Sequence, residues 1–162
     1  MKINLFIMLL FFLVSIRSVN AQEKSLKKYE AVTKFNPSRN PVLDVKEAVA
    51  EAEKSNRRII LDVGGNWCIW CHRIDNFIDD NKDLYDLLHR NFVVVKVNYS
   101  PENKNEEFLS GYPKIPGYPH FFVLEENGEL LHSQDTGKLE KGKGYDKEKF
   151  IAFIKKWAPK RK

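Results

Sequence analysis

The residues best suited to chemistry in this sequence are two cysteines separated by two residues. They are Cys68 and Cys71, in the stretch NWCIWCH, and the chain contains no others. A bridge between residues this close would close a very small loop, so it would constrain little of the unfolded chain and stabilise the fold weakly. The pair is therefore expected to be a reactive redox dithiol rather than a structural cross-link.

The same stretch also spells the attachment sequence of a c-type haem, because His72 follows Cys71. An iron of the common His/Met kind needs a methionine, and Met1 and Met8 both lie in the apolar leader. A histidine could complete the iron instead, and the candidates are His89, His120 and His132. A c-type haem carrier thus stays as a remote alternative. A zinc site would need two further ligands, and no second CxxC or paired histidine spacing is present, so we expect no cofactor and no metal.

The amino-terminal residues have the character of a secretory signal peptide. Lys2 gives a positive start, Leu5 to Ile16 is almost continuously apolar, and Val19-Asn20-Ala21 offers small side chains for cleavage. We expect a signal peptide over residues 1–21 and a periplasmic or secreted mature protein. The apolar run is shorter than the roughly 20 residues that span a bilayer. The alternative is an uncleaved membrane anchor formed by residues 3–16.

The charge balance of the remaining chain does not favour nucleic acid as a partner. Loss of residues 1–21 removes Lys2, Arg17 and no acidic residue, so the formal charge falls from +5 to about +3. The basic residues near the carboxyl end are interpreted as a solvated helix end and tail. About 140 residues remain, which is enough for one domain with one core. We expect a monomer.

Apolar periodicity predicts alternating helices and strands after a polar, lysine-rich leading arm at residues 22–41. The expected elements are a helix near 45–52 capped by Asp44, a strand at 59–63, a helix at 71–88 broken at 79–81, a strand at 92–97, a short helix at 103–109, a hairpin of strands 121–124 and 129–132 around Asn127-Gly128, a Gly- and Lys-rich loop at 137–144 and a helix at 150–157.

This order, with the cysteine pair just after the first buried strand, resembles the thioredoxin family over about residues 42–158. The positions that carry the resemblance are Asp62 in the first strand, Trp67 before the first cysteine, Cys68 and Cys71 themselves, Lys96 in the second strand and Pro119 before the third. The run WCIWCHRIDNFIDDNKDLYDLL also looks like the thioredoxin-like domain of bacterial thiol:disulfide interchange proteins. The resemblance implies an α/β thioredoxin fold over residues 42–162: a central mixed β-sheet flanked by helices, with the CxxC at the amino terminus of a helix.

The resemblance also implies a role for each of these residues. Cys68, at a helix amino terminus that favours its thiolate, would attack a partner disulfide, and Cys71 would resolve the mixed disulfide, so that Cys68–Cys71 is the expected redox disulfide. Asp62, its charge offset by Lys96, would help to take the proton from the resolving cysteine, or the two would form a plain structural ion pair. Pro119 would be the cis-proline of the family, or a simple turn proline.

The sequence departs from the thioredoxin pattern where partner choice and redox potential are tuned. Ile69-Trp70 replaces the usual Gly-Pro between the sulfurs, and Tyr118 and His120 flank Pro119. A protonated His120 near the sulfurs would favour the thiolate and make the protein more oxidising. The residues expected to contact a protein substrate are Trp67, Trp70, Tyr118 and Pro119.

The expected function is that of an exported thiol:disulfide oxidoreductase, acting as a reductase or electron relay. Its expected partners are protein thiols and disulfides in the exported compartment, with a membrane electron donor as a further candidate and no nucleic acid. The alternative is a thioredoxin-fold binding or chaperone module with an inert disulfide. The loop Lys138 to Lys143 and two exposed tryptophans, Trp67 and Trp70, could form its surface.

Overall fold

The computed structural model describes residues 28–160, so the expected signal peptide lies outside the described residues. The elements in chain order are α1 (Pro41–Ser55), β1 (Arg58–Gly64), α2 (Ile69–Asp80), α3 (Lys82–Asn91), β2 (Phe92–Asn98), α4 (Glu106–Leu109), β3 (His120–Leu124), β4 (Leu130–Asp135), the 3-10 helix η1 (Thr136–Leu139), β5 (Glu140–Lys141), β6 (Gly144–Tyr145) and α5 (Lys147–Trp157). Between residues 28 and 160, no helix is both long enough and apolar enough to cross a membrane.

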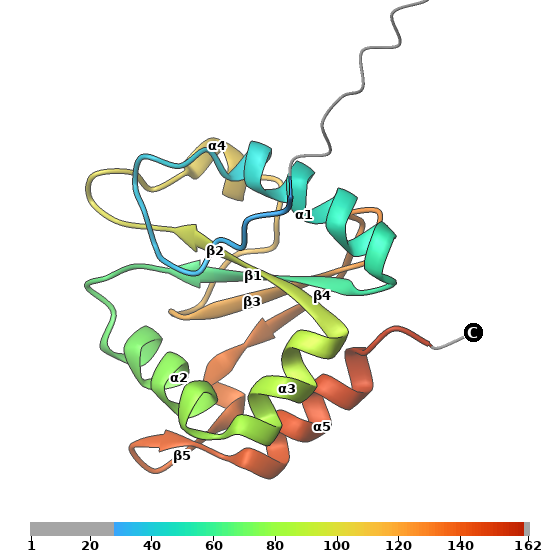
Figure 1. The fold of residues 1–162 in the computed structure, drawn as a ribbon. Helices are drawn as coiled ribbons and strands as arrows, with labels where there is room; N and C mark the ends of the chain where they lie inside the picture. Colours follow the sequence, from blue (N-terminus) through green and yellow to red (C-terminus); the bar gives the residue numbers. More distant parts are fainter. Residues whose placement is uncertain (1–27, 161–162) are drawn as a thin grey trace, which may run out of the picture.

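A four-stranded mixed sheet forms the centre of the fold, with the strand order β2-β1-β3-β4. β1 and β2 are parallel, whereas β3 runs antiparallel to both β1 and β4. The carboxyl end of β1 leads through a short loop into α2 (Figure 1). Cys68 is the N-cap of α2, and Cys71 lies in its first turn. The expected mixed sheet flanked by helices is therefore confirmed.

Each face of the sheet packs against its own layer of helices. On one face, Ala48 and Ala52 of α1 pack on alternate residues of β1 and β2, and α4 lies on the same side. On the other face, α2, α3 and α5 bury apolar side chains such as Ile74, Leu84 and Phe150 against the sheet. Because successive strand residues point to opposite faces, Ile60 and Asp62 point toward the α2 side and Leu61 toward the α1 side.

The first helix begins earlier than the sequence analysis predicts. Asn40, not Asp44, is the N-cap of α1, and its side chain accepts a hydrogen bond from the Val42 N–H at 3.0 Å. Pro41 follows as the first helical residue, a position that tolerates the missing N–H of proline. Asp44 lies inside the first turn and pairs with Arg39. The prediction of an Asp44 cap is therefore wrong.

The later elements agree with the predicted order except in one loop. The long helix is broken into α2 and α3 at Asn81, and the β3–β4 hairpin turns at Gly128, whose φ is +88°. The predicted Gly- and Lys-rich loop is not wholly irregular, because it contains η1 and the short hairpin β5–β6. This hairpin pairs Glu140 with Tyr145.

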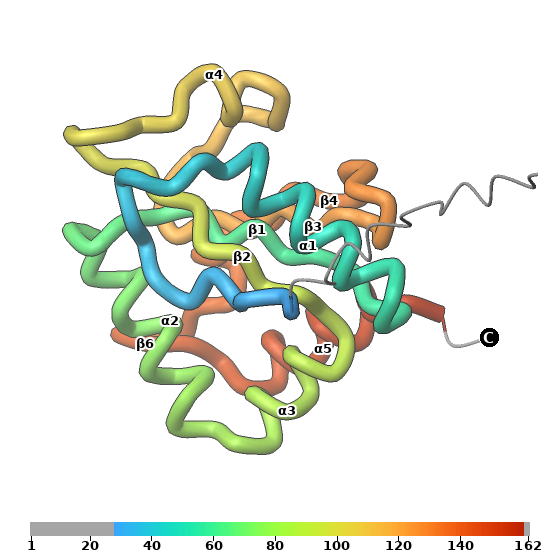
Figure 2. The backbone as a smooth tube through the Cα atoms, turned by 45° about the horizontal axis from the view of Figure 1, so that its top comes forward, coloured from blue at the N-terminus to red at the C-terminus, as the bar shows by residue number. Residues whose placement is uncertain are grey.

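The described part of the leading arm, residues 28–40, contains no helix or strand but packs against the domain. Figure 2 shows this segment in blue, running beside β2 and past the start of α2. Val32 accepts a backbone hydrogen bond from the N–H of Lys96 at 3.1 Å. Val32 and Phe35 are both buried, although most residues around them are exposed.

Candidate redox site

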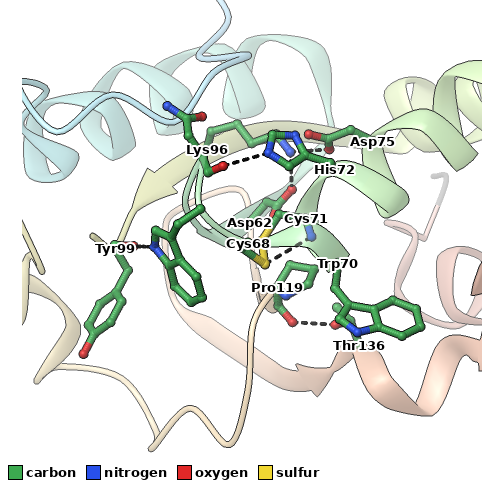
Figure 3. Close-up of a disulfide and its surroundings, with 12 residues drawn as sticks. Asp62, Cys68, Trp70, Cys71, His72, Asp75, Lys96, Tyr99, Pro119 and Thr136 are labelled. Atoms are coloured by element: carbon green, nitrogen blue, oxygen red, sulfur yellow. Dashed lines mark hydrogen bonds and ion pairs between the residues drawn. A yellow bond between two sulfur atoms is a disulfide. The ribbon is translucent and has the colours of Figure 1, made fainter. Parts of the chain in front are cut away.

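The site is built around a disulfide between Cys68 and Cys71 at the amino end of α2 (Figure 3). Cys68 is the N-cap residue, and its sulfur accepts the backbone N–H of Cys71 at 3.1 Å. The Cα atoms are 5.2 Å apart, within the range of ordinary disulfides. Both residues are buried, Cys71 completely and Cys68 almost so. A thiolate on Cys68 would therefore meet an N–H donor and the positive end of the helix dipole.

The sulfur of Cys71, the inner one of the pair, has room because the last residue of β1 is a glycine. A Cβ atom on Gly64 would lie 2.5 Å from the sulfur of Cys71 and 3.0 Å from Cζ of Phe35. A Cβ atom essentially never lies 2.5 Å from another heavy atom, and 3.0 Å is already tight, so a larger residue would displace the sulfur. Phe35 forms a small buried cluster with the two cysteines. The sequence analysis did not identify Phe35 as a site residue.

Behind the disulfide, three charged residues form a buried network. Lys96 donates hydrogen bonds to the carboxylates of Asp62, at 2.6 Å, and of Asp75. The side chains of Asp62 and Lys96 are nearly inaccessible, whereas Asp75 is partly exposed. The structure thus brings the predicted pair together and adds Asp75, which the sequence analysis missed. Its position four residues after Cys71 on a helix is the local signal that could have identified it.

Burial and the neighbouring charges shift the pKa values of both Asp62 and Lys96. Burial raises the pKa of Asp62, an effect that Lys96 offsets only in part and that Asp75 reinforces. Burial lowers the pKa of Lys96, but the two carboxylates outweigh it and raise that pKa above its usual value. Among the described residues, Oδ1 of Asp62 has no hydrogen-bond partner. Lys96 is therefore a fixed cation, and Asp62 is a carboxylate that can take up a proton.

The loop before β3 lies against the disulfide and contains the predicted cis-proline. The peptide bond between Tyr118 and Pro119 is cis. The hydroxyl of Thr136, at the start of η1, donates a hydrogen bond to the Pro119 carbonyl, as Figure 3 shows. No backbone–backbone hydrogen bond joins Tyr118 to another residue in the described part of the chain.

The aromatic residues around the disulfide differ in exposure. Trp67 is 55% exposed, and its indole N–H donates to the Tyr99 carbonyl at 2.7 Å. Tyr118 stacks on Tyr99 and meets the edge of Trp67. Trp70 is half-buried beneath Arg73 and beside Tyr145, so the expectation that both tryptophans are exposed holds for Trp67 alone.

The two nearby histidines are placed differently. His72 is exposed, and its Nε2 lies 2.8 Å from the Asn66 carbonyl. His120 is buried in β3 with its Nε2 2.8 Å from the hydroxyl of Ser133. Burial lowers the pKa of His120 to about 4. His120 is therefore neutral near neutral pH, and the expected oxidising effect of a protonated His120 is not supported.

Within residues 28–160, no group of three or more His, Cys, Asp or Glu side chains could hold a metal ion. A buried disulfide at a helix amino terminus, with an acid behind it, supports thiol–disulfide redox chemistry.

The comparisons with known proteins point to one family. Residues 40–125 match the model of a family described as thioredoxin-like. A solved structure of a disulphide isomerase from Xylella fastidiosa Temecula1 superposes with a TM-score of 0.65 at 23% identity, covering 75% of this chain and 94% of that one. The oxidised carboxyl-terminal domain of DsbD from Neisseria meningitidis has a TM-score of 0.54 at 18% identity, covering 76% and 98%. At these identities the structural matches establish the fold.

A sequence relative matches a shorter stretch. Spermatogenesis-associated protein 20 of Rattus norvegicus is 40% identical over 52 residues, which are 32% of this chain. The match spans 7% of the length of that relative. This chain therefore corresponds to a small part of that protein.

Proposed function

This chain belongs to the thioredoxin-like family, and from this premise we propose that it is an exported thiol:disulfide oxidoreductase that works as a reductase or electron relay. One observation carries the proposal. The sulfur of Cys68 occupies the N-cap of α2 and accepts the N–H of Cys71, so the helix end is arranged to stabilise a thiolate there. The thiolate is the species that attacks disulfides.

In the reductive direction, the reaction begins with attack by the thiolate of Cys68 on a partner disulfide. A bond forms between Cys68 and one partner sulfur, the partner S–S bond breaks, and the second partner sulfur leaves as a thiolate. Cys71 then gives up its proton and attacks the sulfur of Cys68. The Cys68–Cys71 bond forms, and the first partner sulfur leaves. Two electrons have passed from the dithiol to the partner, whose thiolates take up two protons.

Asp62 is the residue that we assign to the proton of Cys71. Its Oδ2 is held by Lys96, and its Oδ1 is free of hydrogen bonds from the described residues. A raised pKa suits a group that must accept a proton near neutral pH and later release it. Lys96 keeps the carboxylate in place and limits the rise of its pKa. Asp75, on α2, also pairs with the Lys96 ammonium.

The partners follow from the surface and from the leader sequence. Trp67, Tyr118 and Pro119 would contact a peptide whose backbone pairs at Tyr118. The signal peptide expected over residues 1–21 supports the proposal that these partners are protein thiols and disulfides outside the cytoplasm. In an oxidising compartment a reductase needs a supply of electrons. A membrane electron donor is the proposed source.

The function is tested by disulfide reduction. The protein, kept reduced by dithiothreitol, should accelerate the reduction of insulin disulfides, and Cys68→Ser should lower the rate to that of dithiothreitol alone. An inert binding module would give the background rate for both proteins and would overturn the proposal. Fractionation of the producing cells, with sequencing of the mature amino terminus, tests export separately. A start near Gln22 is expected.

A further inference from the structure

Within the described part of the leading arm, residues 28–40, Phe35 is the one fully apolar side chain that packs against the cysteines. It is 6% exposed, although Lys34 and Asn36 on either side are exposed. It forms a buried cluster with Cys68 and Cys71, against which Trp70 and Tyr118 also pack. A solvated linker would not bury a phenylalanine in this way. The burial of Phe35 therefore comes from its contacts with the two cysteines.

The ring of Phe35 is a direct neighbour of the inner sulfur. The sulfur of Cys71 and the Cζ atom of Phe35 converge on the same small space beside Gly64, 2.5 Å and 3.0 Å from the point that a Cβ would occupy. The ammonium of Lys96 also lies close to this ring, 4.7 Å from its centroid. Phe35 thus packs against the resolving cysteine and also against the cation that holds Asp62.

Several contacts fix the arm in this position. The Asn66 side chain donates to the Phe35 carbonyl at 3.3 Å, and the Lys96 N–H donates to the Val32 carbonyl at 3.1 Å. Two residues further on, the Asn103 side chain donates to the Pro37 carbonyl at 2.8 Å. The arm is tied on both sides of Phe35, so the position of the ring is determined by the fold rather than by chance contact.

We propose that Phe35 is a positioning residue of the redox site, which seals the sulfur of Cys71 from solvent on the side of the leading arm. The inference rests on the proposed function, in which Cys71 reacts with the sulfur of Cys68 and not with outside molecules. An apolar cover disfavours a free thiolate at Cys71 and excludes other thiols and oxidants. The outer sulfur, Cys68, is then the one that partners reach.

The test measures the reactivity of Cys71 directly. In a Cys68→Ser background, Cys71 is the sole thiol, and its rate of alkylation by iodoacetamide can be followed by mass spectrometry. Phe35→Ala should raise this rate by about tenfold or more, because the truncation opens a path to the sulfur. Val32→Ala is the matched control, since Val32 is equally buried in the same arm but packs away from the cysteines. Its rate, corrected for the measured free energy of unfolding, should stay at the parent value.

Conservative variants separate a sealing role from general stability. Phe35→Leu should return the rate to within about twofold of the parent, because it keeps an apolar cover. Phe35→Val should raise the rate above the rates of the parent and of Phe35→Leu, because it leaves part of the sulfur uncovered. This comparison tests the proposal even if Phe35→Ala does not fold. Equal corrected rates for the Phe35 and Val32 variants would overturn the proposal. The alkylation assay needs neither a partner protein nor catalytic turnover. Its outcome can therefore be told apart from a failure of the protein to reduce insulin.

Discussion

The ammonium of Lys96 lies 2.6 Å from the carboxylate of Asp62, across two adjacent parallel strands. The two residues are direct partners in the β1–β2 register, so their side chains point to the same face of the sheet. Asp75 reaches the same ammonium from α2. One buried cation therefore links the sheet to the helix that carries the cysteines, and it holds Asp62, the carboxylate to which we assign the proton of Cys71.

Replacing Asp62 with Asn should slow thiol–disulfide exchange near neutral pH, because an amide cannot accept the proton of Cys71. The fold should remain intact, since the two side chains are nearly isosteric. The rate of insulin reduction as a function of pH is the measurement. A pH profile identical to that of the parent would assign Asp62 to structure alone.

The same variant should change the pH dependence of stability. Because burial raises the pKa of Asp62, the folded protein binds this proton more tightly than the unfolded chain does. The stabilisation from this proton is complete below the ordinary pKa of about 4 and is lost as pH rises through the raised value. Asp62→Asn should remove this decline. Urea unfolding at several pH values would measure the free energy of unfolding of both proteins. The same dependence on pH for the parent and the variant would contradict the prediction.

Lys96→Met should lower the free energy of unfolding by about 3 kcal/mol near neutral pH, because two carboxylates lose their shared cation. The loss should shrink at acid pH, where Asp62 takes up a proton. Lys82→Met is the control, since Lys82 forms an exposed pair with Asp86. It should change stability by less than about 0.5 kcal/mol. Similar effects of both substitutions on the free energy of unfolding would mean that the buried Lys96 network contributes little to stability.

Gly64→Ala should disturb the disulfide, because the new methyl group would lie 2.5 Å from the sulfur of Cys71. Overpacking of this kind costs about 1–3 kcal/mol. Gly117→Ala is the matched control, because no atom lies within 4 Å of the position its Cβ would take. Urea unfolding of the oxidised proteins compares the two. Equal stabilities would show that the site can accommodate the methyl group.

The order of events at the two sulfurs can be tested by trapping. With Cys71→Ser, Cys68 should still attack a partner disulfide, but no neighbouring thiol can release the adduct. A higher-mass band that dithiothreitol removes should therefore accumulate with Cys71→Ser and be absent with Cys68→Ser. Mass spectrometry of the band would identify the partners. The reverse pattern would exchange the roles of the two cysteines.

The parts of the fold that could be predicted are those with strong local signals. The Asn127-Gly128 turn required a left-handed residue, and Gly128 provides it. The apolar pattern of β1 contains one acid, and that acid faces the lysine of β2 as the family resemblance implied. The predicted cap of α1 was wrong because the helix begins before its apolar pattern does: Asn40 caps it, and Pro41 is its first residue.

The parts that could not be predicted depend on contacts between distant segments. Phe35 gains its burial from the cysteines and from Lys96, more than thirty residues away along the chain, and its own neighbours are polar. Nothing local distinguishes it from a solvated residue of the arm. Asp75 had a local signal in its helical spacing from Cys71, but its partner lies on β2. Such a pairing is visible only once the chain has folded.

The hydrogen bond from the Lys96 N–H to the Val32 carbonyl also bears on self-association. β2 is the outer strand of the sheet, and an uncovered outer strand is a template on which another chain can add a strand. The leading arm occupies part of that edge. A molecule whose arm has come away would therefore present an open edge and an uncovered sulfur at the same end of the sheet. Aggregation and unwanted cross-linking would then arise from a single local opening.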